Sequence, residues 1–142
     1  MGEIPSSFAQ CKRLENIFLA SNQLTGAIPD KLGTLSELRL LSVGNNSLTG
    51  EIPSSFGNLT NAILIEINFN NIEGVIPSEL GYLPNIEYLN LCPNRLTGTL
   101  PNSLLNASTL TFLQVTSSNL MGHIPNFPLQ LGSPFHYLQD YS

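Results

Sequence analysis

Glycine recurs along this chain with a constant step of 24 residues. Six glycines keep that step: Gly2, Gly26, Gly50, Gly74, Gly98 and Gly122. Six prolines keep the same step three residues later, from Pro5 to Pro125. Two residue types phased together without an insertion indicate an internal repeat, and a period of about 20–50 residues is typical of solenoids, propellers and arrays.

Residues 38–59 show how one period is divided. Leu41 and Val43 alternate with outward positions, which is the period-2 pattern of a short strand with one buried face. Gly50 supplies a tight or closely packed backbone position, and Pro53 suits the first position of a short helical turn. Each period is therefore predicted to be a strand, a turn, a second extended piece and a helical turn.

An asparagine follows each predicted strand at the turn. These residues are Asn22, Asn46, Asn70 and Asn94, and Ser118 stands at the next equivalent position. A buried asparagine offers two amide donors and a carbonyl acceptor to neighbouring backbone. Stacked in successive turns, the four residues are predicted to form a ladder that satisfies backbone groups costing about 1–3 kcal/mol each when buried without a partner.

One period cannot bury its own apolar face, so the periods must stack to make a continuous core. The predicted fold is an α/β solenoid, a right-handed coil with a parallel β-sheet along one face. Residues 1–125 are expected to form this solenoid, with about five repeats and no caps. The repeat decays after Pro125, so residues 126–142 are expected to be an irregular tail or a makeshift cap.

The repeat closely resembles that of plant-type leucine-rich-repeat proteins, whose consensus is LxxLxLxxNxLTGxIPxxLGxL. One copy here reads Leu14, Ile17, Leu19, Asn22, Leu24, Gly26, Ile28, Pro29, Leu32, Gly33 and Leu35. The resemblance covers about residues 1–125, and it departs from the consensus at Ala62, Leu105 and Ala107. It implies a curved superhelix with the sheet on its concave face and short 3-10 or helical turns on its convex side.

The resemblance also implies a function. Most such repeats form the ectodomains of cell-surface receptor-like kinases or receptor-like proteins, which recognise peptides or proteins in defence or developmental signalling, sometimes with a co-receptor. The parent protein is then expected at the extracellular side of the plasma membrane. Secreted inhibitors of fungal pectin-degrading enzymes share the repeat and are a second hypothesis. A structural spacer that binds nothing is a third.

The ends of the chain carry a separate expectation. The chain begins within a repeat, and it contains no signal peptide, membrane span or kinase domain, so it looks like a piece or a truncated product of a longer protein. Without caps, the segments Leu14–Leu19 and Leu110–Val115 are expected to expose apolar faces. Self-association through these ends follows from that exposure.

Composition and charge argue against several other functions. The net charge is −5 and no basic block is present, which disfavours nucleic acid as a partner. No apolar run approaches the roughly 18 residues that a membrane span requires. His123 and His136 have no further ligand at metal-binding spacing, and no catalytic constellation is found. The chain is therefore expected to be no enzyme and to need no cofactor or metal.

Strand residues that face away from the core form parallel columns, and two of these columns supply the candidate binding residues. The apolar column is Leu40, Leu64, Tyr88 and Phe112, and the column beside it is Phe18, Ser42, Glu66, Asn90 and Gln114. Strands in a sheet lie about 4.8 Å apart, so the first column would be a contiguous apolar stripe flanked by polar groups, as at a binding patch. The alternative is that this column tilts into the edge of the core.

Three asparagines stand in N-x-Ser/Thr triplets, which are acceptors for N-glycosylation in secreted proteins. They are Asn45, Asn58 and Asn106. Asn58 and Asn106 are expected on the outer side of their turns. Asn45 is a weaker candidate, because it adjoins the ladder.

The positions of residues within the repeat also predict whether two pairs of side chains interact. Cys11 occupies a core leucine position and Cys92 an exposed position several turns away, so a mutual disulfide is not expected. Glu15 and Arg39 share a column in adjacent turns, and an ion pair between them is expected, worth at most about 1 kcal/mol at a surface.

Overall fold

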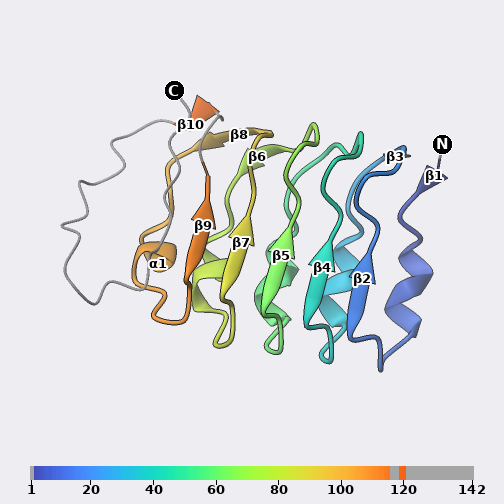
Figure 1. Ribbon diagram of the computed structural model, residues 1–142, viewed down its shortest axis with the longest axis horizontal. Coiled ribbons are helices and arrows are strands. Elements are labelled where there is room, and N and C mark those ends of the chain that lie inside the picture. The colour runs from blue at the N-terminus through green and yellow to red at the C-terminus, as the bar shows by residue number, and fades with distance from the viewer. Residues whose placement is uncertain (1, 116–118, 121–142) are drawn as a thin grey trace.

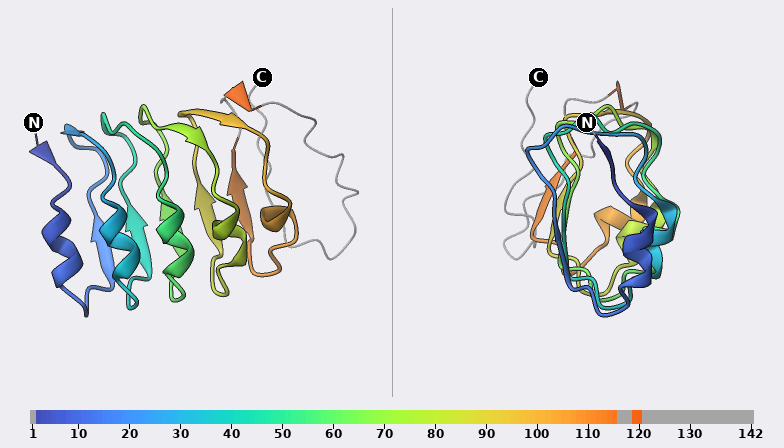
Figure 2. Two further views of the ribbon diagram at one scale, coloured as in Figure 1. Left: turned by 180° about the vertical axis from the view of Figure 1, so that it is seen from behind. Right: turned by 90° about the vertical axis from the view of Figure 1, so that its right-hand side faces the viewer.

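The computed structural model describes residues 2–115 and 119–120, and the chain winds as a solenoid of stacked turns (Figure 1). In each turn the chain rises through a strand, crosses to the opposite side and descends through a helical turn, which makes the coil right-handed (Figures 1 and 2). The predicted fold class is confirmed. Residues 126–142 lie outside the described residues, so the predicted tail stays a prediction.

The main sheet has one strand from each turn. Its strands, all parallel, are β2 (Asn16–Phe18), β4 (Leu40–Ser42), β5 (Leu64–Glu66), β7 (Tyr88–Asn90) and β9 (Phe112–Gln114), in that order. In register, Leu40 pairs with Leu64, Leu64 with Tyr88, and Tyr88 with Phe112. Because the repeat has no insertion, residues 24 apart in the sequence lie side by side in space.

A second set of strands runs along a neighbouring side of the solenoid. It comprises β1 (Gly2–Glu3), β3 (Leu24–Thr25), β6 (Glu73–Val75), β8 (Arg95–Gly98) and β10 (Asn119–Leu120). β1 pairs with β3, and β8 lies between β6 and β10. Two isolated bridges, between residues 27 and 49 and between 51 and 73, continue the parallel pairing across the intervening turns. The sequence predicted the extended pieces and not their pairing into sheets.

Helical turns lie on the side opposite the main sheet (Figure 2). Four are 3-10 helices, η1 (Ser6–Gln10), η2 (Asp30–Thr34), η3 (Ser54–Asn58) and η4 (Ser78–Tyr82), and the fifth is the α-helix α1 (Asn102–Leu105). Each begins directly after a proline in extended conformation, so Pro53 precedes its helical turn by one residue rather than opening it as predicted. The α-helical turn is the one in which Leu105 replaces the repeated glycine.

The core fills the space between the main sheet and the helical turns. Each strand contributes an inward residue such as Ile65 or Leu89, and each helical turn contributes one such as Phe56 or Leu80. All four of these side chains are fully buried. Ala62, where the consensus has leucine, is also part of this core.

The asparagine ladder is present as predicted. The Asn46 side-chain amide donates to the carbonyl of Leu19 in the preceding turn (2.9 Å) and to that of Val43 in its own turn (3.0 Å), while its Oδ1 accepts the Leu24 N–H (3.0 Å). Asn70 and Asn94 repeat the pattern. The side chain of Asn22, in the first of these turns, bonds only to its own turn. Ser118 lies outside the described residues.

Both cysteine placements differ from the prediction. Cys11 is exposed, because it caps η1 in the first turn, which has a neighbouring turn on one side only. Cys92 is buried in the core cluster, because β7 has ended at Asn90 and the chain bends inward toward the ladder. The two cysteines form no disulfide with each other, as expected.

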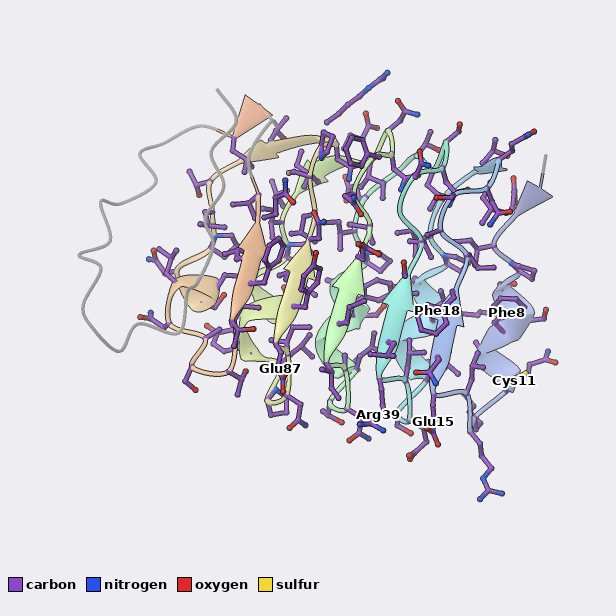
Figure 3. All side chains as sticks on the ribbon, viewed as in Figure 1. Phe8, Cys11, Glu15, Phe18, Arg39 and Glu87 are labelled. Atoms are coloured by element: carbon purple, nitrogen blue, oxygen red, sulfur yellow. The ribbon has the colours of Figure 1, made fainter. Side chains whose placement is uncertain are left out.

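Two further expectations are wrong. Glu15 and Arg39 form no ion pair, although the Arg39 N–H donates to the Glu15 carbonyl at 2.7 Å; their side chains extend from the edge where the strands begin (Figure 3). Leu110, Leu113 and Val115 are buried rather than exposed, because they point into the common core. In the segment Leu14–Leu19, Ile17 is buried, and Leu14 and Leu19 are half-buried.

Candidate ligand-binding face

The solvent-facing side of the main sheet, called the open face below, carries the predicted apolar column. Leu40, Leu64, Tyr88 and Phe112 lie side by side on β4, β5, β7 and β9, and each is half-buried. The rings of Tyr88 and Phe112 are stacked, with centroids 4.2 Å apart and planes 3° from parallel. The column therefore forms a continuous stripe that is neither part of the core nor fully solvated.

The second column is less accessible than predicted at two positions. Ser42 and Asn90 are each only 6% exposed. The Ser42 hydroxyl donates to Glu66 Oε2 at 2.6 Å, which places the carboxylate against it. Glu66 and Gln114 are half-buried, as a polar rim requires. Phe18, at the end of the column, is 66% exposed (Figure 3).

Unsatisfied acceptors lie close to this column. The Oδ1 atoms of Asn68 and Asn90 are buried and accept no hydrogen bond from the described part of the chain. A Cβ atom built on Gly44 would lie 2.5 Å from Asn68 Oδ1, so the glycine makes room for that amide. These two oxygens lie beneath the surface, and Glu66 is the one charged residue in the two predicted columns of the open face.

Sequence reasoning missed one exposed aromatic residue in this region. Phe69 is 58% exposed and has a left-handed backbone (φ 53°), a conformation that bulky residues rarely adopt. Ser21 and Asn45, at the equivalent positions of earlier turns, share it. The sequence does distinguish this position, because Phe69 stands where the two earlier turns have the small polar residues Ser21 and Asn45.

All three asparagines of the glycosylation triplets are exposed. Asn58 ends η3, and its side chain makes no hydrogen bond to the described residues. The Asn106 amide donates to the carbonyl of Asn102 at 3.0 Å. The Asn45 amide donates to the Ser21 hydroxyl at 3.2 Å, and its backbone is left-handed. Asn58 is thus the least constrained acceptor of the three.

A separate groove of about 840 Å³ lies along the turns that follow the second strands. Its lining includes three carboxylates, Asp30, Glu51 and Glu79, and the exposed side chain of Val75. No residue of the two open-face columns lines it. None of the residues that line this groove belongs to the binding site predicted from the sequence.

The described residues contain few features of other functional classes. Within residues 2–115 and 119–120, no three His, Cys, Asp or Glu side chains gather to hold a metal ion. No helix of this part of the chain has the length and hydropathy that a membrane span requires. His123 and His136 lie outside the described residues.

Comparison with known proteins gives matches to one family. Two family models, both described as leucine-rich repeats, match residues 36–96 and 13–35. The two matches adjoin and together cover more than half of the chain. A search of curated proteins finds no match.

Solved structures of plant receptors have the same fold. The ectodomain of GASSHO1/SCHENGEN3 from Arabidopsis thaliana, in complex with CASPARIAN STRIP INTEGRITY FACTOR 2, is 37% identical over 87% of this chain, with a TM-score of 0.85. The Arabidopsis receptor kinase HAESA, in complex with the peptide hormone IDA and the co-receptor SERK1, is 34% identical over 87%, with a TM-score of 0.84. The BIR2 ectodomain from Arabidopsis thaliana is 31% identical over 80%, with a TM-score of 0.75.

The chain spans only part of each of these relatives, 15% of GASSHO1/SCHENGEN3, 21% of HAESA and 59% of BIR2. The similarity is therefore between this chain and a segment of the repeats in each receptor. The motif, the stacked turns, the ladder and both family matches agree. The chain belongs to the leucine-rich-repeat family, and its repeats are similar to those of plant receptor-kinase ectodomains.

Proposed function

We propose that this chain is a recognition module for a peptide or a protein, and that it binds its ligand along the open face. In its parent protein it forms part of a plant cell-surface receptor ectodomain on the extracellular side of the membrane, acting in defence or developmental signalling. The complexes of GASSHO1/SCHENGEN3 and HAESA support the proposal, because similar repeats there belong to ligand-bound ectodomains. HAESA also provides a precedent for a co-receptor.

The stacked pair of Tyr88 and Phe112 is the observation that carries the proposal. The core does not need these rings, because the inward residues Leu89 and Leu113 of the same strands already fill it and are at most 1% exposed. Rigid aromatic side chains beside polar groups are typical anchors of binding surfaces. Their position on the open face therefore favours recognition over a purely structural role.

The size of the face favours a short ligand segment. The main sheet has five strands, which at a spacing of about 4.8 Å make it roughly 20 Å wide. That width accommodates a short extended peptide or a corner of a folded protein. A longer parent ectodomain would continue the same surface.

The test is selection of short random peptides on the immobilised 142-residue chain. Selected peptides should bind the wild-type chain and lose affinity for the Tyr88→Ala/Phe112→Ala variant. Tyr82→Ala is the matched control, since Tyr82 is 75% exposed on η4, on the opposite side of the solenoid. Unchanged binding by the double variant would contradict the proposal, and failure to select any peptide would favour the spacer hypothesis.

The inhibitor hypothesis has its own test. A secreted inhibitor should reduce the activity of a fungal pectin-degrading enzyme when the chain is added in excess. Loss of that inhibition in the Tyr88→Ala/Phe112→Ala variant would show that the enzyme binds at the open face. No observation in the described residues favours this alternative over the receptor.

A further inference from the structure

Glu66 lies at the centre of the open face. It belongs to β5, the middle strand of the main sheet, and it is in register with Ser42 on one side and Asn90 on the other. Its side chain is half-buried. Any ligand that covers the face must therefore come close to this carboxylate.

No cationic side chain of the described residues pairs with Glu66. Its one side-chain hydrogen bond is from the Ser42 hydroxyl, and among the described residues it has no ion-pair partner. Arg39 extends from the edge where the strands begin (Figure 3), and Arg95 belongs to β8 in the other sheet. A ligand is thus needed to supply the counter-charge when the face is covered.

Covering Glu66 with an apolar ligand would be strongly unfavourable. Removing a carboxylate from water without a partner costs several kcal/mol, whereas a donor aligned with it forms a short, charge-assisted hydrogen bond. Neither register partner of Glu66, Ser42 or Asn90, carries a positive charge that could replace the water.

We infer that the open face binds a ligand segment carrying a basic side chain, an arginine or a lysine, which pairs with Glu66. The inference rests on the proposed function and specifies the ligand. Tyr88 lies diagonally next to Glu66 across the β5–β7 pair, so the apolar stem of such a side chain would rest beside the stacked rings. A guanidinium suits the site well, because its planar fork of donors can bond both oxygens of one carboxylate.

The test compares peptides selected on the wild-type chain with peptides selected on Glu66→Gln. Wild-type peptides should be enriched in arginine or lysine at a fixed distance from an aromatic or aliphatic residue. Replacing that basic residue by glutamine should weaken binding to the wild-type chain by about thirtyfold or more. The same replacement should have little effect on binding to Glu66→Gln, because the interaction energy of the pair is already lost.

Two controls make the outcomes distinct. Glu87→Gln removes an exposed carboxylate from the edge where the strands begin (Figure 3), and it should leave the arginine or lysine preference unchanged. Thermal unfolding of Glu66→Gln establishes that the variant is folded. Peptides that depend on Tyr88 and Phe112 but show no basic residue would overturn this inference alone. Peptides that bind independently of Tyr88 and Phe112 would overturn the proposed function as well.

Discussion

The ring of Tyr88 stacks on that of Phe112 across the strands β7 and β9, with 4.2 Å between the ring centroids. The pair lies on the half-buried open face and not in the core. Tyr88→Ala is therefore expected to lower the free energy of unfolding by only about 1–2 kcal/mol, from partial burial and stacking. Chemical denaturation provides the measurement.

Leu89→Ala is the matched core variant on the same strand. Leu89 is fully buried, so its truncation should cost about 2–5 kcal/mol. An equal loss for Tyr88→Ala would assign the aromatic column to the core and remove it from the candidate site.

The ladder gives a second prediction. Asn46→Ala leaves the Leu24 N–H of the preceding turn without its acceptor, and it removes a donor from the carbonyls of Leu19 in that turn and Val43 in its own. The expected loss is about 2–4 kcal/mol in the free energy of unfolding. Asn22→Ala is the control and should cost less than about 1 kcal/mol, since Asn22 is exposed and its side chain bonds only within its own turn. Similar losses for both variants would contradict the role of the ladder in joining turns.

Contact between helical turns gives a third prediction. A Cβ atom on Gly81 would lie 2.3 Å from the backbone carbon of Ser103 and 2.4 Å from the Leu104 nitrogen. Gly81→Ala should therefore separate η4 from α1 and destabilise the chain by about 1–3 kcal/mol. Gly2→Ala, where a Cβ atom meets nothing within 4 Å, should change stability by less than about 0.5 kcal/mol. A neutral Gly81→Ala, measured by thermal unfolding, would show that the turns are not in tight contact.

Glycosylation gives a fourth prediction. When the chain is produced in a plant secretory pathway, Asn58 is expected to carry a glycan, because it is exposed and its amide is unconstrained. Asn106 is expected to be the next most occupied. Asn45 should be least occupied, because its amide is bound to Ser21. Mass spectrometry of the wild-type chain and Asn58→Gln measures the occupancy, and a glycan at Asn45 with none at Asn58 would contradict this order.

Much of the fold could be predicted from the sequence, because the repeat has no insertion. The constant step places Leu64 beside Tyr88 and lets Asn46 and Asn22 donate to the same Leu19 carbonyl, so columns in the sequence become columns in space. The prolines predicted where the helical turns begin. These features depend on local geometry that is the same in every turn.

The accessibility of individual side chains could not be predicted in the same way. Ser42 and Asn90 share a column with the exposed Phe18, yet both are buried. Their burial depends on the size and bonding of neighbours in adjacent turns, as the bond from Ser42 to Glu66 shows. Cys92 is buried because the chain bends after β7, a change of direction that the alternation within the strand does not reveal.

The most direct test of recognition by the open face is NMR mapping of a selected peptide on the wild-type chain. The account predicts the largest chemical-shift changes at the side chains of Leu40, Leu64, Tyr88 and Phe112, with little change in η2, η3 and η4. Changes concentrated instead at Glu51, Val75 and Glu79 would place the ligand in the separate groove and would contradict the proposed site.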